Sequence, residues 1–194
     1  MLQHIKDNLK EAHDALSQLM ENNEALSQIE KAGAMLSECF KNKGHVYSCG
    51  NGGSMCDAMH FAEELSGRFR KDRPALGAIA MGDGAHITCS GNDFGFDYIF
   101  SRFVEAQGRT GDVLVGISTS GRSKNVIEAA KKAKELGLKV IILTGKPNSE
   151  LGKLADVEIC TPGGKFADRV QELHIKVIHI LIELVERQMF NQEY

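Results

Sequence analysis

The sequence has no CxxC pair and no surplus of basic residues. Its five cysteines are odd in number and none lies three positions from another, so neither a disulfide framework nor a thiolate zinc site is expected. Lys and Arg number 23 against 26 Asp and Glu, for a formal net charge of −3. Because the basic residues are also scattered, a nucleic-acid partner is not expected.

Long apolar runs are missing as well. The most apolar stretch, VIHILIELV at 177–185, is too short to cross a bilayer. Residues 1–16 do not contain the apolar region of a signal peptide. A cytoplasmic protein without a membrane partner is therefore expected. At 194 residues, with 42% hydrophobic and 25% charged content, the chain suits one globular domain of ordinary size.

The first 43 residues are helical in pattern. One apolar seam alternates spacings of three and four, through Leu2, Ile5, Leu9, Ala12, Leu16 and Leu19. A second helical stretch follows and stops at Gly44. The two helices could pack on each other as a hairpin, or the seam could face another subunit, which we favour. We expect a single domain over 1–194 with 1–43 as oligomerisation helices.

From Gly44 onward, short β-rich runs alternate with helical segments. The strands are expected at 45–49, 77–81, 112–118, 139–143 and 156–160, and the helices at about 55–66, 96–107, 123–136, 147–154 and 167–188. This alternation predicts an α/β fold, a parallel sheet with helices on both faces. Ligands in such a sheet bind beyond the carboxyl ends of the strands.

Two loops fall at those strand ends. GNGGS (50–54) precedes a helix for which Ser54 is the expected N-cap, with Asp57 in a capping-box position. STSGRS (118–123) carries hydroxyls at Ser118, Thr119, Ser120 and Ser123 ahead of the next helix. Hydroxyls and free N–H groups at a helix N-terminus bind phosphate. Each loop could be only a helix cap, but two in one sheet favour a binding cleft. The absence of G-x-G-x-x-G and GK[ST] points to a small phosphorylated metabolite rather than a nucleotide.

Several polar side chains stand out beside these loops. Asp57, His60 and Glu64 share one stripe of the helix after GNGGS, so His60 and Glu64 could hold one metal, act as base and partner, or form a solvated pair. His179 lies in the apolar closing helix, as a buried core residue or a functional one. Gln171 lies two turns earlier, about 80° away around the axis, so both can face one side.

Other polar residues have a structural explanation of equal weight. His174 points away from that side of the closing helix and is expected to be structural. Asp93, in SGNDFGF (90–96), could bind sugar hydroxyls or form a turn. The basic stretch GRFRKDRP (67–74) is interpreted as a solvated loop.

Four stretches resemble the phosphoheptose isomerases of the sugar isomerase (SIS) domain family. They are SCGNGGSMCDAMHFAEELSGR (48–68), GNDFGF (91–96), GDVLVGISTSGRS (111–123) and DRVQELHIKVIHIL (168–181). The resemblance implies a five-stranded parallel sheet flanked by helices in a three-layer sandwich, a homotetramer, and one zinc ion per subunit. The implied zinc ligands are His60, Glu64, Gln171 and His179. The implied phosphate contacts are Ser118, Thr119, Ser120 and Ser123. The implied sugar contacts are Asn51, Gly52, Gly53, Ser54, Asn92, Asp93 and Asp168, with Glu64 and Gln171 also meeting the substrate.

The implied reaction converts sedoheptulose 7-phosphate to D-glycero-D-manno-heptose 7-phosphate through an enediol, the first step of nucleotide-activated heptose biosynthesis and, in the family, of lipopolysaccharide core formation. Glu64 is the expected base, His179 its acid/base partner, and zinc would stabilise negative charge. Met55 and Arg122 depart from the family pattern. The rival reading is a non-catalytic SIS scaffold resembling the DnaA initiator-associating protein, which would have no reason to keep the implied zinc ligands together with the hydroxyl loop.

Overall fold

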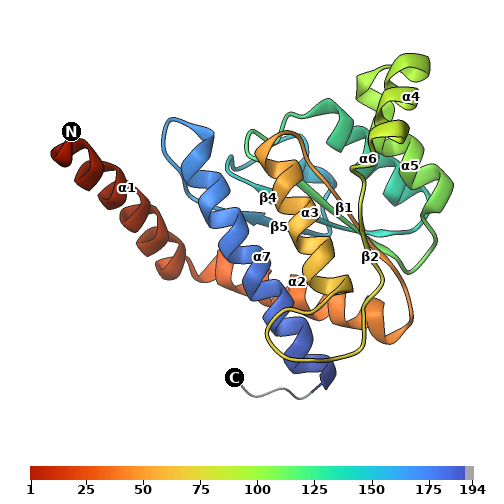
Figure 1. Ribbon diagram of the computed structural model, residues 1–194, viewed down its shortest axis with the longest axis horizontal. Coiled ribbons are helices and arrows are strands. Elements are labelled where there is room, and N and C mark those ends of the chain that lie inside the picture. The colour runs from red at the N-terminus through yellow and green to blue at the C-terminus, as the bar shows by residue number, and fades with distance from the viewer. Residues whose placement is uncertain (191–194) are drawn as a thin grey trace.

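Five parallel strands form the centre of the computed structural model, which describes residues 1–190. The strands are β1 (Val46–Cys49), β2 (Ala78–Ala80), β3 (Val113–Ser118), β4 (Lys139–Thr144) and β5 (Val157–Cys160). They lie in the order β2-β1-β3-β4-β5, all parallel (Figure 1). The chain passes from β1 to one neighbour and later returns to the other side, so the order reverses between β1 and β3. That reversal is where ligands bind in open α/β sheets.

Helices cover both faces of this sheet and confirm the expected α/β architecture. One face packs on α2 (Asn23–Lys41), α3 (Gly53–Ser66) and α7 (Ala167–Phe190), whose apolar residues form one core with the strands. The other face packs on α5 (Ile99–Gln107) and α6 (Lys124–Glu135), which form a second core. Strands buried on both faces are nearly continuous in apolar residues, as in β3 and β4.

The first helix, α1 (Leu2–Glu21), extends away from the body of the chain (Figure 1). Only its last part is buried, through Ala15 and Leu19. Leu2, Ile5 and Leu9 at the start of its apolar seam are 66%, 56% and 67% exposed. The seam therefore does not pack as a compact hairpin on α2 within this single chain.

Three local expectations were wrong. The helix expected at 147–154 is only a short 3₁₀ turn, Gly152–Leu154, because Asn148 adopts a left-handed conformation (φ +57°) that a right-handed α-helix does not contain. The region before 96 holds a helix that was not expected, α4 (Gly84–Phe94), which Asp83 caps by accepting a hydrogen bond from the His86 N–H.

The third wrong expectation concerns the helix after β1. Its N-cap is Gly52, with φ +56°, and Ser54 lies inside the first turn with its side chain buried. A positive φ favours glycine at this position, so the backbone rather than a hydroxyl determines where α3 begins. No helix within residues 1–190 is both long enough and apolar enough to span a membrane.

Candidate active site

The first loop brings the start of α3 against the start of α7. A Cβ added to Gly53 would lie 2.6 Å from Nε2 of Gln171 and 3.0 Å from its Oε1. The absence of a side chain at Gly53 therefore allows the Gln171 amide to lie directly on the loop. Both helices follow strands of the same parallel sheet, so they run in the same direction from this meeting point.

Two to three turns further along these helices, three metal-ligating side chains converge. His60 and Glu64 come from α3 and His179 from α7, 119 positions away from His60. His60 Nε2 is 3.3 Å from Glu64 Oε1 and 3.5 Å from His179 Nε2. One ligand atom from each residue lies within 4.8 Å of the others. These three residues, the His60–Glu64–His179 cluster, have the donor atoms and spacing needed to bind a divalent metal ion.

The cluster is partly shielded from solvent. The side chain of Glu64 is 19% exposed and that of His60 39%. Burial, and secondarily the neighbouring His60, lower the pKa of His179, while Glu64 acts in the opposite direction. The neutral imidazole that this favours is the form that binds metal.

Asp57 lies on the same stripe of α3, between Gly53 and His60. Its Oδ2 is buried without a hydrogen-bond partner among residues 1–190. Burial raises the pKa of Asp57 to about 6, against a smaller opposing effect of His60. Of the expected stripe, His60 and Glu64 therefore point toward His179 on α7, and the carboxylate of Asp57 is turned away from bulk solvent.

The loop after β3 is built as a compact hydroxyl-rich turn. Ser118 Oγ and Ser123 Oγ are 2.9 Å apart, and Ser120 Oγ accepts a hydrogen bond from the Arg122 N–H. Gly121 has φ +63°, which allows the chain to reverse before α6. Ser118 is buried, whereas Thr119, Ser120 and Ser123 are partly accessible. With Ser123 at the N-cap of α6, the loop presents hydroxyls and helix N–H groups to an anion.

A pair of amides joins the two loops. Asn51, in the first loop, exchanges two hydrogen bonds with Asn125 in the first turn of α6, at 2.9 Å and 2.8 Å. Asn125 was not among the residues expected from the sequence. The one sequence signal for Asn125 was a polar residue two positions after the STSGRS loop, which also fits an ordinary first turn of a helix.

The remaining expected sugar contacts lie at the ends of helices. Asn92 donates to Asp93 near the end of α4, and both side chains are exposed. Asp97, shortly after them, lies 3.8 Å from Lys124 at the start of α6, so this segment is on the same side of the sheet as the hydroxyl loop. Asp168 lies in the first turn of α7 and accepts a hydrogen bond from the Arg169 N–H.

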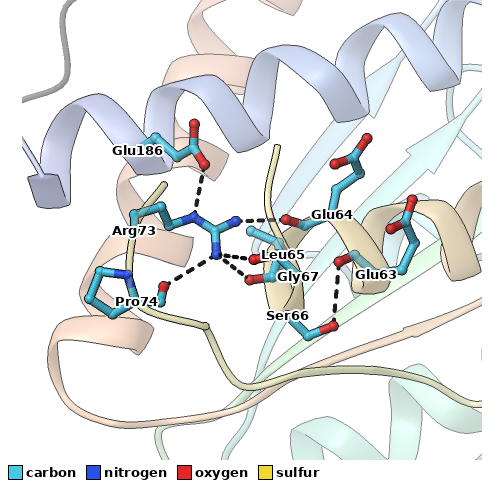
Figure 2. A network of polar contacts seen from close by, with 8 residues as sticks. All are labelled: Glu63, Glu64, Leu65, Ser66, Gly67, Arg73, Pro74 and Glu186. Atoms are coloured by element: carbon cyan, nitrogen blue, oxygen red, sulfur yellow. Dashed lines mark hydrogen bonds and ion pairs between the residues drawn. The ribbon is translucent and has the colours of Figure 1, made fainter. Parts of the chain in front are cut away.

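The basic segment 67–74 is not a simple solvated loop, contrary to the expectation. The side chain of Arg73 is 1% exposed and pairs with a fully buried Glu186 on α7 (Figure 2). Phe69 stacks on His179 with ring centroids 5.7 Å apart. His174 also proves to be a core residue, donating from Nε2 to the Thr144 carbonyl.

Comparison with known proteins agrees with this geometry. The profile of the SIS domain matches residues 8–145. Phosphoheptose isomerase of Histophilus somni is 55% identical over 97% of this chain and 96% of its own length, and that of Salmonella paratyphi B is 56% identical over 95% and 96%. The solved structure of phosphoheptose isomerase GmhA from Neisseria gonorrhoeae superposes with a TM-score of 0.88 at 39% identity, covering 96% of this chain and 99% of that one. The chain belongs to the phosphoheptose isomerase family of SIS-domain proteins.

Proposed function

We propose that this protein is the isomerase that converts sedoheptulose 7-phosphate to D-glycero-D-manno-heptose 7-phosphate. The observation that carries the proposal is the His60–Glu64–His179 cluster, assembled from two helices. The Asn51–Asn125 pair joins the loop at the start of one of them, α3, to the first turn of α6, which follows the hydroxyl loop. A non-catalytic scaffold of the same fold has no use for such a cluster. The names of the relatives support the same reaction class.

Zinc is the proposed metal. Four ligands at about 2.0–2.1 Å around a tetrahedral zinc lie about 3.3 Å from one another. The separations of 3.3 Å and 3.5 Å in the cluster are close to this value. Gln171 is the proposed fourth ligand; its amide lies against Gly53, two turns before His179 on α7, so it would have to turn toward the cluster to bind the metal. When bound, zinc polarises the sugar carbonyl and stabilises the negative charge that develops on oxygen.

The phosphate of the substrate is proposed to bind at the hydroxyl loop. Its contacts are Ser118, Thr119, Ser120 and Ser123. The partial positive charge at the start of α6 supports this assignment because it favours a dianion without any lysine. The sugar chain then extends toward the first loop, where the proposed contacts are Asn51, Gly52, Gly53, Ser54, Asn92, Asp93, Asp168 and Gln171.

Proton transfer is assigned to Glu64 and His179. Glu64 removes a proton from C1 of the ketose, which leaves negative charge on the C2 oxygen of the enediolate. His179 carries the proton of the C1 hydroxyl to the C2 oxygen, and Glu64 returns its own proton to C2 to complete the aldose. Both residues also serve as metal ligands before the sugar binds, so we propose that their contacts rearrange when substrate enters.

The active form is proposed to be a cytoplasmic homotetramer in which residues 1–43 supply contacts between subunits. The exposure of Leu2, Ile5 and Leu9 supports this, because a monomer rarely leaves such a seam in water. A hollow between α1 and the loop at Gly163 and Gly164 also leaves α1 loosely packed in the single chain.

The test is conversion of sedoheptulose 7-phosphate by purified protein in three states: untreated, chelated, and restored with zinc. His179→Gln is compared with His13→Gln, which changes an exposed histidine on α1. We expect activity to fall on chelation, to return with zinc, and to be absent only in His179→Gln. Activity indifferent to chelation would remove zinc from the proposal, and a folded protein inactive in all three states would overturn the isomerase.

A further inference from the structure

Arg73 is the centre of a buried polar network at the end of α3. Its Nε donates to Glu186 Oε1 at 2.8 Å, and the two side chains are 1% and 0% exposed (Figure 2). Its remaining nitrogens donate to the backbone carbonyls of Glu64 (2.6 Å), Leu65 (2.7 Å), Gly67 (3.0 Å) and Pro74 (3.2 Å). A guanidinium supplies five N–H donors in a planar fork, which an ammonium cannot reproduce.

Two of these carbonyls, those of Glu64 and Leu65, belong to the last turn of α3, the helix that carries two cluster residues. The last four C=O groups of a helix have no partner within it. Because α3 ends at Ser66, Arg73 satisfies two of these groups, on Glu64 and Leu65. One of them is the backbone of Glu64 itself, whose carboxylate lies 3.3 Å from His60.

The anionic partner of Arg73 comes from the other helix of the cluster. Glu186 lies seven residues after His179 on α7, two turns further on the same face and about 10 Å along the axis. The Arg73–Glu186 pair therefore joins the ends of α3 and α7 just beyond the point where their cluster residues meet.

The segment between α3 and Arg73 also reaches the cluster. Phe69 stacks on His179 at an interplanar angle of 26°. Arg70 lies over the Phe69 ring at 5.1 Å and pairs with Glu183 on α7 at 2.8 Å. Arg73 bonds to the carbonyls at both ends of this segment, Gly67 and Pro74, so it holds the base of the loop that delivers Phe69.

A buried ion pair seldom makes a fold more stable than apolar side chains in the same positions would. Apolar residues of similar size often stabilise a fold as well or better, whereas loss of one partner leaves a costly buried charge. The pair here makes contacts that apolar residues could not, because it positions the backbone of Glu64 and the loop over His179.

We propose that Arg73 and Glu186 are positioning residues that hold the His60–Glu64–His179 cluster in its metal-binding geometry. The inference rests on the proposed metal site. It predicts that metal affinity depends on the Arg73 fork separately from the stability of the fold. Residues that orient metal ligands typically contribute about 10- to 100-fold to metal affinity.

The test measures zinc dissociation constants on chelator-stripped protein, by competition with a chromophoric chelator, together with thermal unfolding of the same metal-free samples. Arg73→Lys keeps the charge next to Glu186 but loses the fork. The double variant Arg73→Met with Glu186→Met removes both charges, so it avoids the unpaired buried charge that either single change would leave, although the carbonyls of Glu64 and Leu65 lose the Arg73 donors. Arg102→Met, which breaks an exposed pair with Glu105 on the opposite face of the sheet, is the control.

The expected result is zinc binding about 10- to 100-fold weaker in Arg73→Lys and in the double variant, with Arg102→Met unchanged. If the double variant regains stability and binds zinc as tightly as the unaltered protein, the pair is only structural and the inference is overturned. If the double variant does not fold, Arg73→Lys alone decides in the same way. If the unaltered protein binds zinc but converts no substrate, the proposed function is contradicted. If it binds no zinc, both the metal site and this inference are overturned.

Discussion

Asn51 and Asn125 exchange two side-chain hydrogen bonds across 74 positions of sequence and so connect the loop after β1 to the first turn of α6. Asn125 is 2% exposed, and its Oδ1 also accepts from the Val126 N–H. The pair therefore fixes the position of the glycine loop relative to α6, the helix that follows the hydroxyl loop.

Replacing Asn125 with Ala is expected to weaken substrate binding more than it slows proton transfer. Two hydrogen bonds are lost, at about 0.5–1.5 kcal/mol each, and Asn51 loses its partner. We expect KM for sedoheptulose 7-phosphate to rise by about tenfold, with kcat reduced less. Asn42→Ala, which removes an exposed hydrogen bond to Glu38, is the control. An unchanged KM in Asn125→Ala would show that the two loops keep their relative positions without the Asn51–Asn125 pair.

Gly53→Ala is expected to impair the enzyme without unfolding it. The added methyl would lie 2.6 Å from Nε2 of Gln171, at the mobile end of a side chain, so the amide must move. We expect a melting temperature within a few degrees of the unaltered protein and a fall in kcat/KM of at least tenfold, about 1.4 kcal/mol. The matched control is Gly84→Ala in α4, where, among residues 1–190 and apart from its chain neighbours and the adjacent backbone of its own helix, no atom lies within 4 Å of the new methyl. Equal activity of the two variants would exclude Gln171 from the site.

His174 is expected to make the fold sensitive to mild acid. Burial lowers its pKa from 6.5 to about 4, a shift opposed by its hydrogen bond to the Thr144 carbonyl. Between pH 6.5 and 4, the unfolded chain therefore binds a proton on His174, whereas the folded chain does not. The free energy of unfolding is highest with respect to this group above pH 6.5 and falls as the pH decreases through that window. The loss is about 3 kcal/mol at 1.36 kcal/mol per pH unit.

The measurement is urea unfolding of the unaltered protein and of His174→Gln at several pH values from 7 to 4. Glutamine can donate the same hydrogen bond but does not titrate, so the difference in unfolding free energy between the two proteins should change with pH. A difference that stays constant over this range would mean that His174 is not held neutral by the fold.

Introducing charge into the seam of α1 is expected to disrupt assembly. Leu9 is 67% exposed in the single chain and belongs to the apolar stripe proposed to contact other subunits. Leu9→Glu should shift the protein from the proposed tetramer to smaller species in size-exclusion chromatography with light scattering. Lys6→Glu, an exposed change outside the seam, should leave the mass unchanged. If Leu9→Glu keeps the mass of the unaltered protein, the oligomerisation role of the first helix is wrong.

The sequence alone was enough for the features that depend on near neighbours. Alternation of β-rich runs with amphipathic segments predicted the parallel α/β sheet and the positions of its five strands, because side-chain period reflects local geometry. The i,i+4 spacing of His60 and Glu64 placed them on one helical face for the same reason. The hydroxyl loop was recognisable because its chemistry lies in six consecutive residues. The resemblance to phosphoheptose isomerases added the reaction, which residue spacing could not supply.

Only the tertiary structure decided how distant segments meet. His179 in an apolar helix could have been a core histidine like His174, and the packing of α3 against α7 is what brings it within 3.5 Å of His60. Arg73 appeared to be one charge in a polar loop, because nothing near it in the chain indicates that Glu186, 113 positions away, will bury it. Asn125 likewise looked like an ordinary first-turn residue until the sheet placed Asn51 beside it. Local patterns record which face a residue occupies, but the contacts across that face are set by the packing of the whole chain.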